Sequence, residues 1–178
     1  INLTNISEDL ASAFAEWVSD SQMRKIVMDL KNQRKLLREY GYKLDGAIED
    51  PSLSSYMCGY IAATNRRLFA ERIEDLAEKY LWIPQQEFSE ALSLFEMPGE
   101  ENLRYFTQVS RVIHELARIL HFEMQEQGQL KIYEDIELPL LYVLADMEQA
   151  GIAVSDALLN ELNDTFSSRA SMAEEQAK

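Results

Sequence analysis

The chain has 178 residues, of which 47% are hydrophobic and 27% charged, an ordinary composition for a folded globular protein. Its formal net charge of -14 argues against an autonomous nucleic-acid binder, because affinity for phosphates comes mainly from Lys and Arg. A single cysteine, Cys58, excludes an intrachain disulfide framework, so we expect a reducing compartment, the cytoplasm. No apolar run approaches the roughly 20 residues of a membrane span, and the N-terminus does not resemble a signal peptide.

Apolar residues recur at helical spacing along most of the chain. Taken in order, we expect helices over residues 7–20, 29–41, 50–60, 71–81, 100–127, 132–150 and 155–166. Residues 24–28 are interpreted as a short buried strand, and residues 42–48 as an extended segment. Asp50 and Pro51 fit the cap and the first position of the third helix.

Two of these helices have a predicted core face. The third is expected to bury Leu53, Tyr56, Met57 and Tyr60. The long helix ends at Gly128, which suits a helix C-terminus, and is expected to bury Leu103, Phe106, Val109, Ile113, Leu116, Ala117 and Leu120. Residues 61–69 are interpreted as a connector and residues 82–99 as the least regular stretch. The last dozen residues have little to bury, so we expect them to be frayed or to be part of a longer segment.

Charge is unevenly distributed along the chain. Residues 24–43 hold seven basic residues against Asp29 and Glu39, whereas residues 133–178 hold two basic and ten acidic ones. One basic stripe therefore lies in an otherwise acidic protein. The simplest interpretation of that stripe is a solvated helix face.

The residue types that most often carry chemistry give weak patterns. His114 and His121 are two helical turns apart, and without a third ligand they do not make a catalytic zinc site. Arg118 stands where the zinc-protease motif needs its second histidine, so both histidines are expected on a helix surface. Cys58 is expected to be a small buried apolar residue, and no glycine-rich phosphate loop is present.

One segment, Glu134 to Val154, carries a specific pattern. It closely resembles the junction between the 3′–5′ exonuclease and polymerase domains of family A DNA polymerases, the DNA polymerase I type. The matching positions are Glu137, Pro139, Leu140, Leu144, Met147, Glu148, Gly151, Ile152 and Val154. The resemblance implies an exonuclease-like domain over residues 1–131, then the junction and the first thumb helix over residues 132–178.

The upstream residues resemble the exonuclease domain of the same family more loosely. Residues 29–34 resemble its second motif and residues 100–105 the approach to its third, while Asp50 stands where the family has an Asp-Thr pair. The implied fold is α/β to mainly α: a ribonuclease-H-like exonuclease domain that lacks its first strands, followed by long helices. Without those strands, Ile26 and Ile48 must be buried in another way.

Departures from the family pattern imply an inactive exonuclease. Active members hold two divalent ions with carboxylates, but the second-motif carboxylate position is Gln33 here. In the third motif Tyr105 is kept, whereas the Asp position is Val109. The first motif would precede Ile1, and the polymerase aspartates of the family follow the thumb. We therefore expect no metal or cofactor in this chain and Mg²⁺ only in the parent polymerase.

The resemblance implies a fragment of a DNA polymerase acting in DNA replication and repair, with this region as an inactive scaffold. Expected partners are the remainder of the polymerase chain, DNA through the parent enzyme and, for the isolated fragment, a second copy; no membrane is expected. The basic stripe then has a second interpretation, as a contact with a phosphate backbone through Lys31, Arg34, Lys35 and Arg38. Two alternatives remain: an autonomous acidic helical interaction domain without nucleic-acid function, and an exonuclease with unorthodox ligands.

Overall fold

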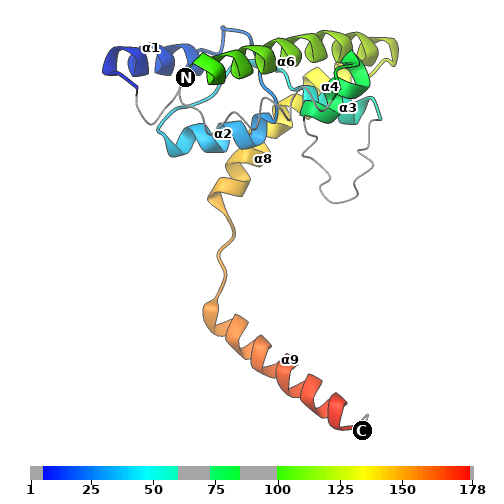
Figure 1. Ribbon diagram of the computed structural model, residues 1–178. Coiled ribbons are helices and arrows are strands. Elements are labelled where there is room, and N and C mark those ends of the chain that lie inside the picture. The colour runs from blue at the N-terminus through cyan, green and yellow to red at the C-terminus, as the bar shows by residue number, and fades with distance from the viewer. Residues whose placement is uncertain (1–5, 60–72, 85–99, 177–178) are drawn as a thin grey trace. The chain divides into compact units, whose positions relative to one another are not determined.

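The computed structural model describes residues 6–59, 73–84 and 100–176 (Figure 1). It divides into two compact units, Ile1–Asp146 and Met147–Lys178, which we describe separately. Within the described ranges, none of the helices combines the length and the hydrophobicity that a membrane crossing needs. The expected connector at residues 61–69 and most of the irregular stretch at 82–99 lie outside the described residues.

Helices form most of the described chain. The elements are α1 (Glu8–Ser19), β1 (Lys25–Ile26), α2 (Leu30–Glu39), β2 (Ala47–Glu49), α3 (Pro51–Met57), α4 (Ile73–Leu81), α6 (Glu100–Glu126), α7 (Leu130–Ile132), the π-helical turn η2 (Tyr133–Glu137), α8 (Leu138–Ala150) and α9 (Asp156–Gln176). The predicted helices are therefore confirmed, with ends that shift by a few residues. The mainly α character is confirmed, whereas the ribonuclease-H-like sheet stays a prediction.

The expected strand at residues 24–28 is shorter than predicted. Lys25–Ile26 pairs in parallel with Ala47–Glu49, and α2 lies in the connection between the two strands. Ile26 is half-buried, and Ile48 is 37% exposed.

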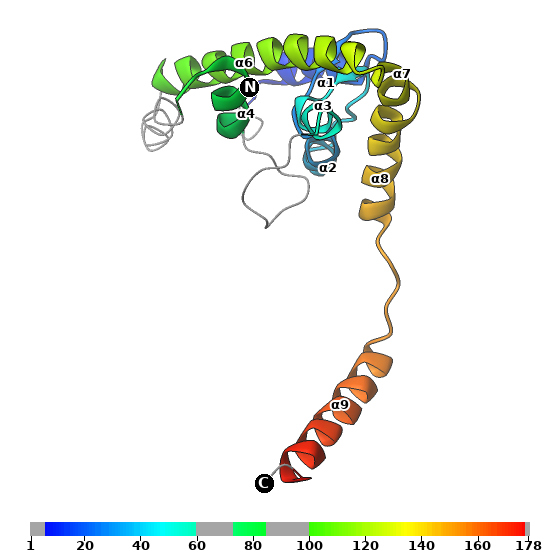
Figure 2. The ribbon, with the colours of Figure 1, turned by 90° about the vertical axis from the view of Figure 1, so that its right-hand side faces the viewer.

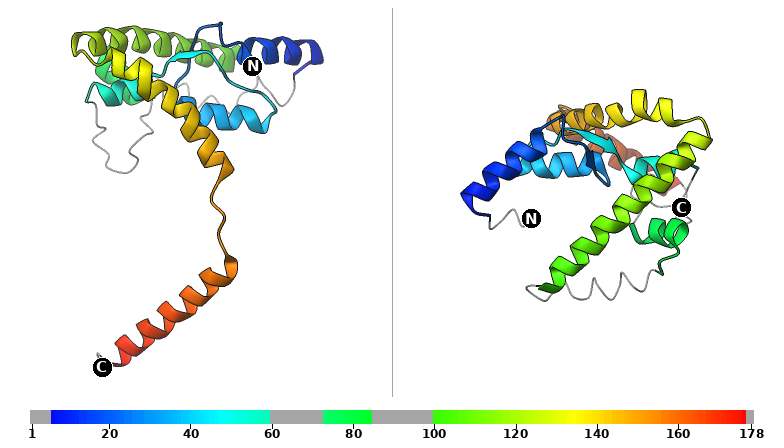
Figure 3. Two further views of the ribbon diagram at one scale, coloured as in Figure 1. Left: turned by 180° about the vertical axis from the view of Figure 1, so that it is seen from behind. Right: turned by 90° about the horizontal axis from the view of Figure 1, so that it is seen from above.

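Helix α6 organises the first unit. It contacts α3, α4 and β1, and Figure 2 shows α3 and α4 along one side of it. The predicted C-terminus is confirmed: Gly128 has a φ of +70°, and Gln129 N donates to Met124 O at 2.8 Å. After this turn the chain runs back through α7, η2 and α8, which Figure 3 shows from behind.

The core of the first unit forms around two clusters of buried side chains. One contains Val18, Leu30, Leu44, Met124, Tyr133 and Leu138, and the other Leu76, Ala77, Val112, Leu116 and Leu120. The predicted face of α6 was therefore right at Leu116, Ala117 and Leu120 but missed Val112 and Met124. Phe106 is 53% exposed, because spacing alone identifies an apolar face and not which part of it meets a neighbour.

The predicted core face of α3 was partly right: Leu53 and Met57 are half-buried and pack against the first core cluster. Pro51, Ser54 and Ser55 are its fully buried residues, whereas Tyr56 is 49% exposed and Tyr60 lies outside the described residues. The helix turns a small polar face inward because Ser54 hydrogen-bonds to the buried Glu49 carboxylate. An apolar count along the helix does not register such a contact.

The C-terminal helices begin and end differently from the predicted ranges. The predicted helix at 132–150 begins at Leu130 and contains the π turn. Tyr133 and Leu138 are buried in the core of the first compact unit, which extends to Asp146. In the second unit, α9 continues to Gln176 instead of fraying after Phe166. Ser155 accepts from Leu158 N at 3.3 Å at its start, in agreement with the predicted cap.

Candidate functional site

The positions that resemble the exonuclease motifs lie on α2, α6 and the β2–α3 turn. Gln33 is exposed in the first turns of α2, and Val109 is half-buried in α6. Tyr105 belongs to α6, but its side chain is outside the described set. Asp50 is only 2% exposed. Among the described residues, no group of three or more His, Cys, Asp or Glu side chains is arranged to hold a metal ion.

The Asp50 carboxylate caps two helices at once. It accepts from Asp29 N at 3.0 Å and Leu30 N at 2.8 Å at the start of α2, and from Ser52 N at 3.0 Å in α3. Burial raises the pKa of Asp50 to about 6, although the three N–H donors favour the charged form. The Asp50 carboxylate thus joins the starts of α2 and α3, and both of its oxygens accept backbone hydrogen bonds.

Next to it, Glu49 is the centre of a buried polar cluster. Its carboxylate is 4% exposed and accepts hydrogen bonds from Ser54, His121 and Tyr133. Burial raises the pKa of Glu49, and these three partners oppose that rise. His121 is 45% exposed and places Nδ1 3.3 Å from Glu49 Oε2, so it is only partly the surface residue expected, whereas His114 is exposed. Sequence reasoning missed Glu49; an acidic pair ending an extended segment was the available signal.

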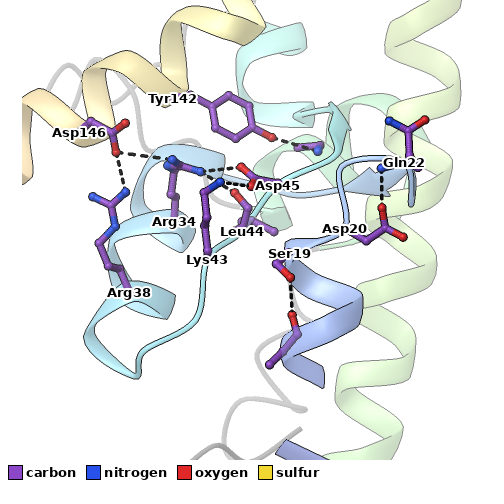
Figure 4. A network of polar contacts seen from close by, with 12 residues as sticks. Ser19, Asp20, Gln22, Arg34, Arg38, Lys43, Leu44, Asp45, Tyr142 and Asp146 are labelled. Atoms are coloured by element: carbon purple, nitrogen blue, oxygen red, sulfur yellow. Dashed lines mark hydrogen bonds and ion pairs between the residues drawn. The ribbon is translucent and has the colours of Figure 1, made fainter. Parts of the chain in front are cut away.

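The basic stripe of α2 turns one arginine inward. Arg34 is 6% exposed, and its Nη1 donates to Leu44 O at 2.6 Å and Asp45 Oδ1 at 3.1 Å (Figure 4). Its guanidinium also lies 4.8 Å from the centre of the Tyr142 ring. Burial by itself would raise the pKa of Asp45, but hydrogen bonds from Lys43 and Arg34 outweigh it and the pKa is lowered.

Asp146 of α8 binds two arginines of α2. Its Oδ1 lies 2.7 Å from Arg38 Nη2 and 3.5 Å from Arg34 Nη2, as Figure 4 shows. The hydrogen bond from Arg38 is the main reason that the pKa of Asp146 is lowered. Lys31 and Lys35 are half-buried on the same helix. The structure therefore uses Arg34 and Arg38 for contacts inside the first unit, a use that charge counting did not anticipate.

Cys58 has no environment for thiol chemistry. It is a free, half-buried cysteine that packs against both core clusters. Burial, with a contribution from Glu123, raises its pKa to about 11. Because the thiolate is the reactive form, this thiol is a poor nucleophile at neutral pH.

Comparison with known proteins gives a consistent picture, although no family profile matches the chain. It is similar to the DNA polymerase I of Mycobacterium leprae, with 28% identity over 172 residues, 93% of this chain and 18% of that protein. The corresponding protein of Bacillus subtilis is 25% identical over 175 residues, 96% of this chain and 20% of that protein. This chain thus spans about a fifth of the length of these relatives.

The fold also matches a solved structure. It is similar to the POL domain of Pol1 from M. smegmatis, solved in complex with DNA primer-template and dNTP, with a TM-score of 0.80. The two chains are 24% identical, and the match covers 99% of this chain and 28% of the other. This likeness shows a shared fold. The sequence relatives show that the chain is homologous to DNA polymerase I across 93% of its length.

Proposed function

We propose that this chain serves a DNA polymerase I-type enzyme in DNA replication and repair as a catalytically inactive, exonuclease-like scaffold. In this proposal residues 1–131 are the degenerate exonuclease-like domain, and residues 132–178 are the junction and the first thumb helix. Homology to DNA polymerase I supports the parent enzyme. A reducing, cytoplasmic location belongs to the same proposal, since Cys58 is a free thiol.

The proposal that the exonuclease-like domain is inactive rests on the residue types at the positions that resemble the exonuclease motifs. Mg²⁺ and Mn²⁺ need oxygen ligands, preferably charged carboxylates. Val109 has no ligand atom, and Gln33 offers a neutral amide in place of a charge. Asp50, the remaining carboxylate among these positions, holds the first turns of α2 and α3. Mg²⁺ enters the proposal only as the cofactor of the whole polymerase.

A nuclease assay tests this proposal. The chain is incubated with a 3′-end-accessible labelled single strand and Mg²⁺ or Mn²⁺, alongside the Gln33→Asp/Val109→Asp variant. Gln108→Asp is the matched control, because Gln108 is an exposed α6 neighbour of Val109 outside the motif. We expect no degradation by the starting chain or the control. Circular dichroism confirms that each variant is folded.

The outcomes separate two explanations. Metal-dependent degradation by the starting chain contradicts the proposal and shows that other ligands are in use. Activity gained only by the double variant supports the assignment of Gln33 and Val109 as the lost ligand positions. If the double variant also stays inactive, restoring two positions is insufficient, as expected when the first motif is needed as well.

DNA contact by α2 is a separate part of the proposal. The structure neighbour was solved with a DNA primer-template, which supports a DNA-binding parent enzyme. Of the four predicted basic residues, Arg34 and Arg38 contact Asp146. Lys31 and Lys35 are less buried than Arg34 on the same helix, and we propose them for a phosphate contact.

A further inference from the structure

The short strand β2 has hydrogen bonds on both of its edges. On one edge, Gly46 O accepts from Lys25 N and Glu49 O accepts from Val27 N, each at 2.9 Å. On the other edge, tyrosine hydroxyls replace a neighbouring strand. The amide of Ala47 donates to Tyr142 Oη at 3.0 Å, and the amide of Asp50 donates to Tyr133 Oη at 2.7 Å.

Both tyrosines belong to one helical segment that runs antiparallel to β2. Tyr133 begins η2 and Tyr142 lies in α8, so the later tyrosine meets the earlier strand residue. The extended backbone from Ala47 to Asp50 spans about 10 Å at 3.3 Å per residue. Eight α-helical residues span about 12 Å at 1.5 Å per residue. The axial spacing of the hydroxyls therefore suits the two amides.

The two tyrosine side chains point toward these amides from the same side of the helix only because of the π turn. Tyr133 and Tyr142 are nine residues apart (142 − 133), and in a regular α-helix nine steps of about 100° place side chains on opposite faces. In η2, Leu138 N donates to Tyr133 O, a bond that encloses one more residue than an α-helical bond. The nine residues from Tyr133 to Tyr142 therefore turn the chain about the helix axis only as far as eight α-helical residues would. The two tyrosine side chains then lie about 80° apart around the axis, on the same side of the helix.

Burial along the segment agrees with this phase. Tyr133, Leu138 and Ala145 are buried, at 0%, 7% and 1% exposure. Ile132 and Ile136, on the other side of the segment, are 50% and 57% exposed. If the same residues formed a regular α-helix without the π turn, Tyr133 would lie about 140° away from the face that carries Leu138 and Ala145.

We propose that the π turn Tyr133–Glu137 is a register device that aligns two tyrosine hydroxyls with the outer edge of β2. It closes that edge of the sheet, because an amide bonded to a tyrosine cannot pair with another strand. It also fixes the phase of α8, so that Tyr142 and Asp146 both reach α2 at Arg34.

Length variants and tyrosine variants of the full 178-residue chain test the device. Deleting Asp135 leaves the tyrosines eight residues apart in a regular α-helix, the same phase as now, so the amides of Ala47 and Asp50 stay protected from hydrogen exchange. Inserting one alanine after Asp135 destroys the phase and releases at least one amide. NMR-detected exchange at Ala47 and Asp50 is the readout, and exchange at Leu116 in α6 shows whether the chain is folded.

The tyrosine variants localise the effect. Tyr142→Phe is expected to raise exchange at Ala47 about tenfold and to leave Asp50 unchanged, since one hydrogen bond is removed; Tyr133→Phe does the reverse. Tyr40→Phe, at a 47% exposed tyrosine in the C-cap of α2, is the matched control and changes neither. A deletion as harmful as the insertion, or an Ala47 amide still protected in Tyr142→Phe, overturns the proposal.

The proposed closing of the outer edge of β2 is tested separately, by measuring whether the chain self-associates. We expect the Tyr133→Phe/Tyr142→Phe variant to self-associate more than the unchanged chain, measured by light scattering at equal concentration. An unchanged size distribution, with both amides exchanging rapidly, overturns the edge-closing part.

Discussion

Asp50 shows how one buried carboxylate can hold two helices. Its three backbone donors come from both sides of the α2–α3 connection, and Asp29 takes a left-handed conformation, φ 57° and ψ 54°, at the first of them. Such a conformation is costly for a residue other than glycine. The cap bonds to the Asp29 and Leu30 amides help to offset that cost.

Replacing Asp50 by asparagine tests its ionisation. Its pKa is raised from 3.8 to about 6 in the folded chain, so the folded state binds the proton more tightly than the unfolded state. The associated stability is fully present below pH 4 and is lost as pH rises through 6. We therefore expect the stability advantage of the natural chain over Asp50→Asn to shrink by roughly 2 kcal/mol between pH 4 and pH 7.

Urea denaturation at several pH values measures this change, with Asp9→Asn on the exposed face of α1 as the control. A gap that widens as pH rises would contradict the raised pKa. Asp50→Ala, which removes the caps altogether, is expected to lower the free energy of unfolding by about 2–4 kcal/mol at pH 7, and by more at pH 4 because alanine does not ionise either.

At the scale of elements, the pairing of β1 with β2 depends on a close approach at Gly46. This residue has a φ of +75°, and a Cβ built on it would lie 2.5 Å from Met23 O and 2.8 Å from Asp20 O. Lys25 fills the same corner: its Nζ donates to both of those carbonyl oxygens, at 2.9 and 2.8 Å, and desolvation by burial lowers its pKa. The loop before β1 and the start of β2 are thus packed backbone against backbone.

Alanine at Gly46 is expected to lower the free energy of unfolding by about 3 kcal/mol or more, because a positive φ and a backbone clash act together. Gly41→Ala is the matched control: its φ is +83°, but nothing lies within 4 Å of the added Cβ. That variant should lose only about 1 kcal/mol. Equal losses in thermal or chemical denaturation would show that the close approach contributes nothing.

At the scale of the whole molecule, charge limits what the chain can do with DNA. The net charge is -14, and Arg34 and Arg38 neutralise Asp45 and Asp146 within the first unit. An arginine that is 6% exposed cannot reach a phosphate without leaving Leu44 O and Asp45. Any phosphate contact of α2 therefore depends on few cations and is strongly opposed by the acidic surroundings.

The salt dependence of single-strand binding tests this limit. Two phosphate contacts, at Lys31 and Lys35, predict a slope of about -1.4 in a plot of log affinity against log salt concentration. Lys31→Gln/Lys35→Gln should flatten the slope, whereas Lys131→Gln, an exposed lysine of α7, should not. A slope near zero in the unchanged chain would exclude the contact, and a much steeper one would point to cations elsewhere.

The sequence by itself determined the local structure and the relatives of this protein. Helical spacing, the Asp50-Pro51 start and the Gly128 end depend on residues within a turn of each other, so they can be interpreted without the fold. The segment Glu134 to Val154 resembled DNA polymerase I, and the comparisons confirmed that homology.

Only the tertiary structure decided how the polar residues are used. Glu49 became a buried acceptor because Tyr133 and His121, far away in the sequence, meet it; Arg34 turned inward because Asp146 and Tyr142 lie beside α2. Tyr133 and Tyr142 likewise meet the amides of Asp50 and Ala47, which lie many residues upstream of them. Whether a charged side chain is solvated or buried depends on partners that are distant along the chain. Hydrophobic periodicity and local propensity do not identify those partners.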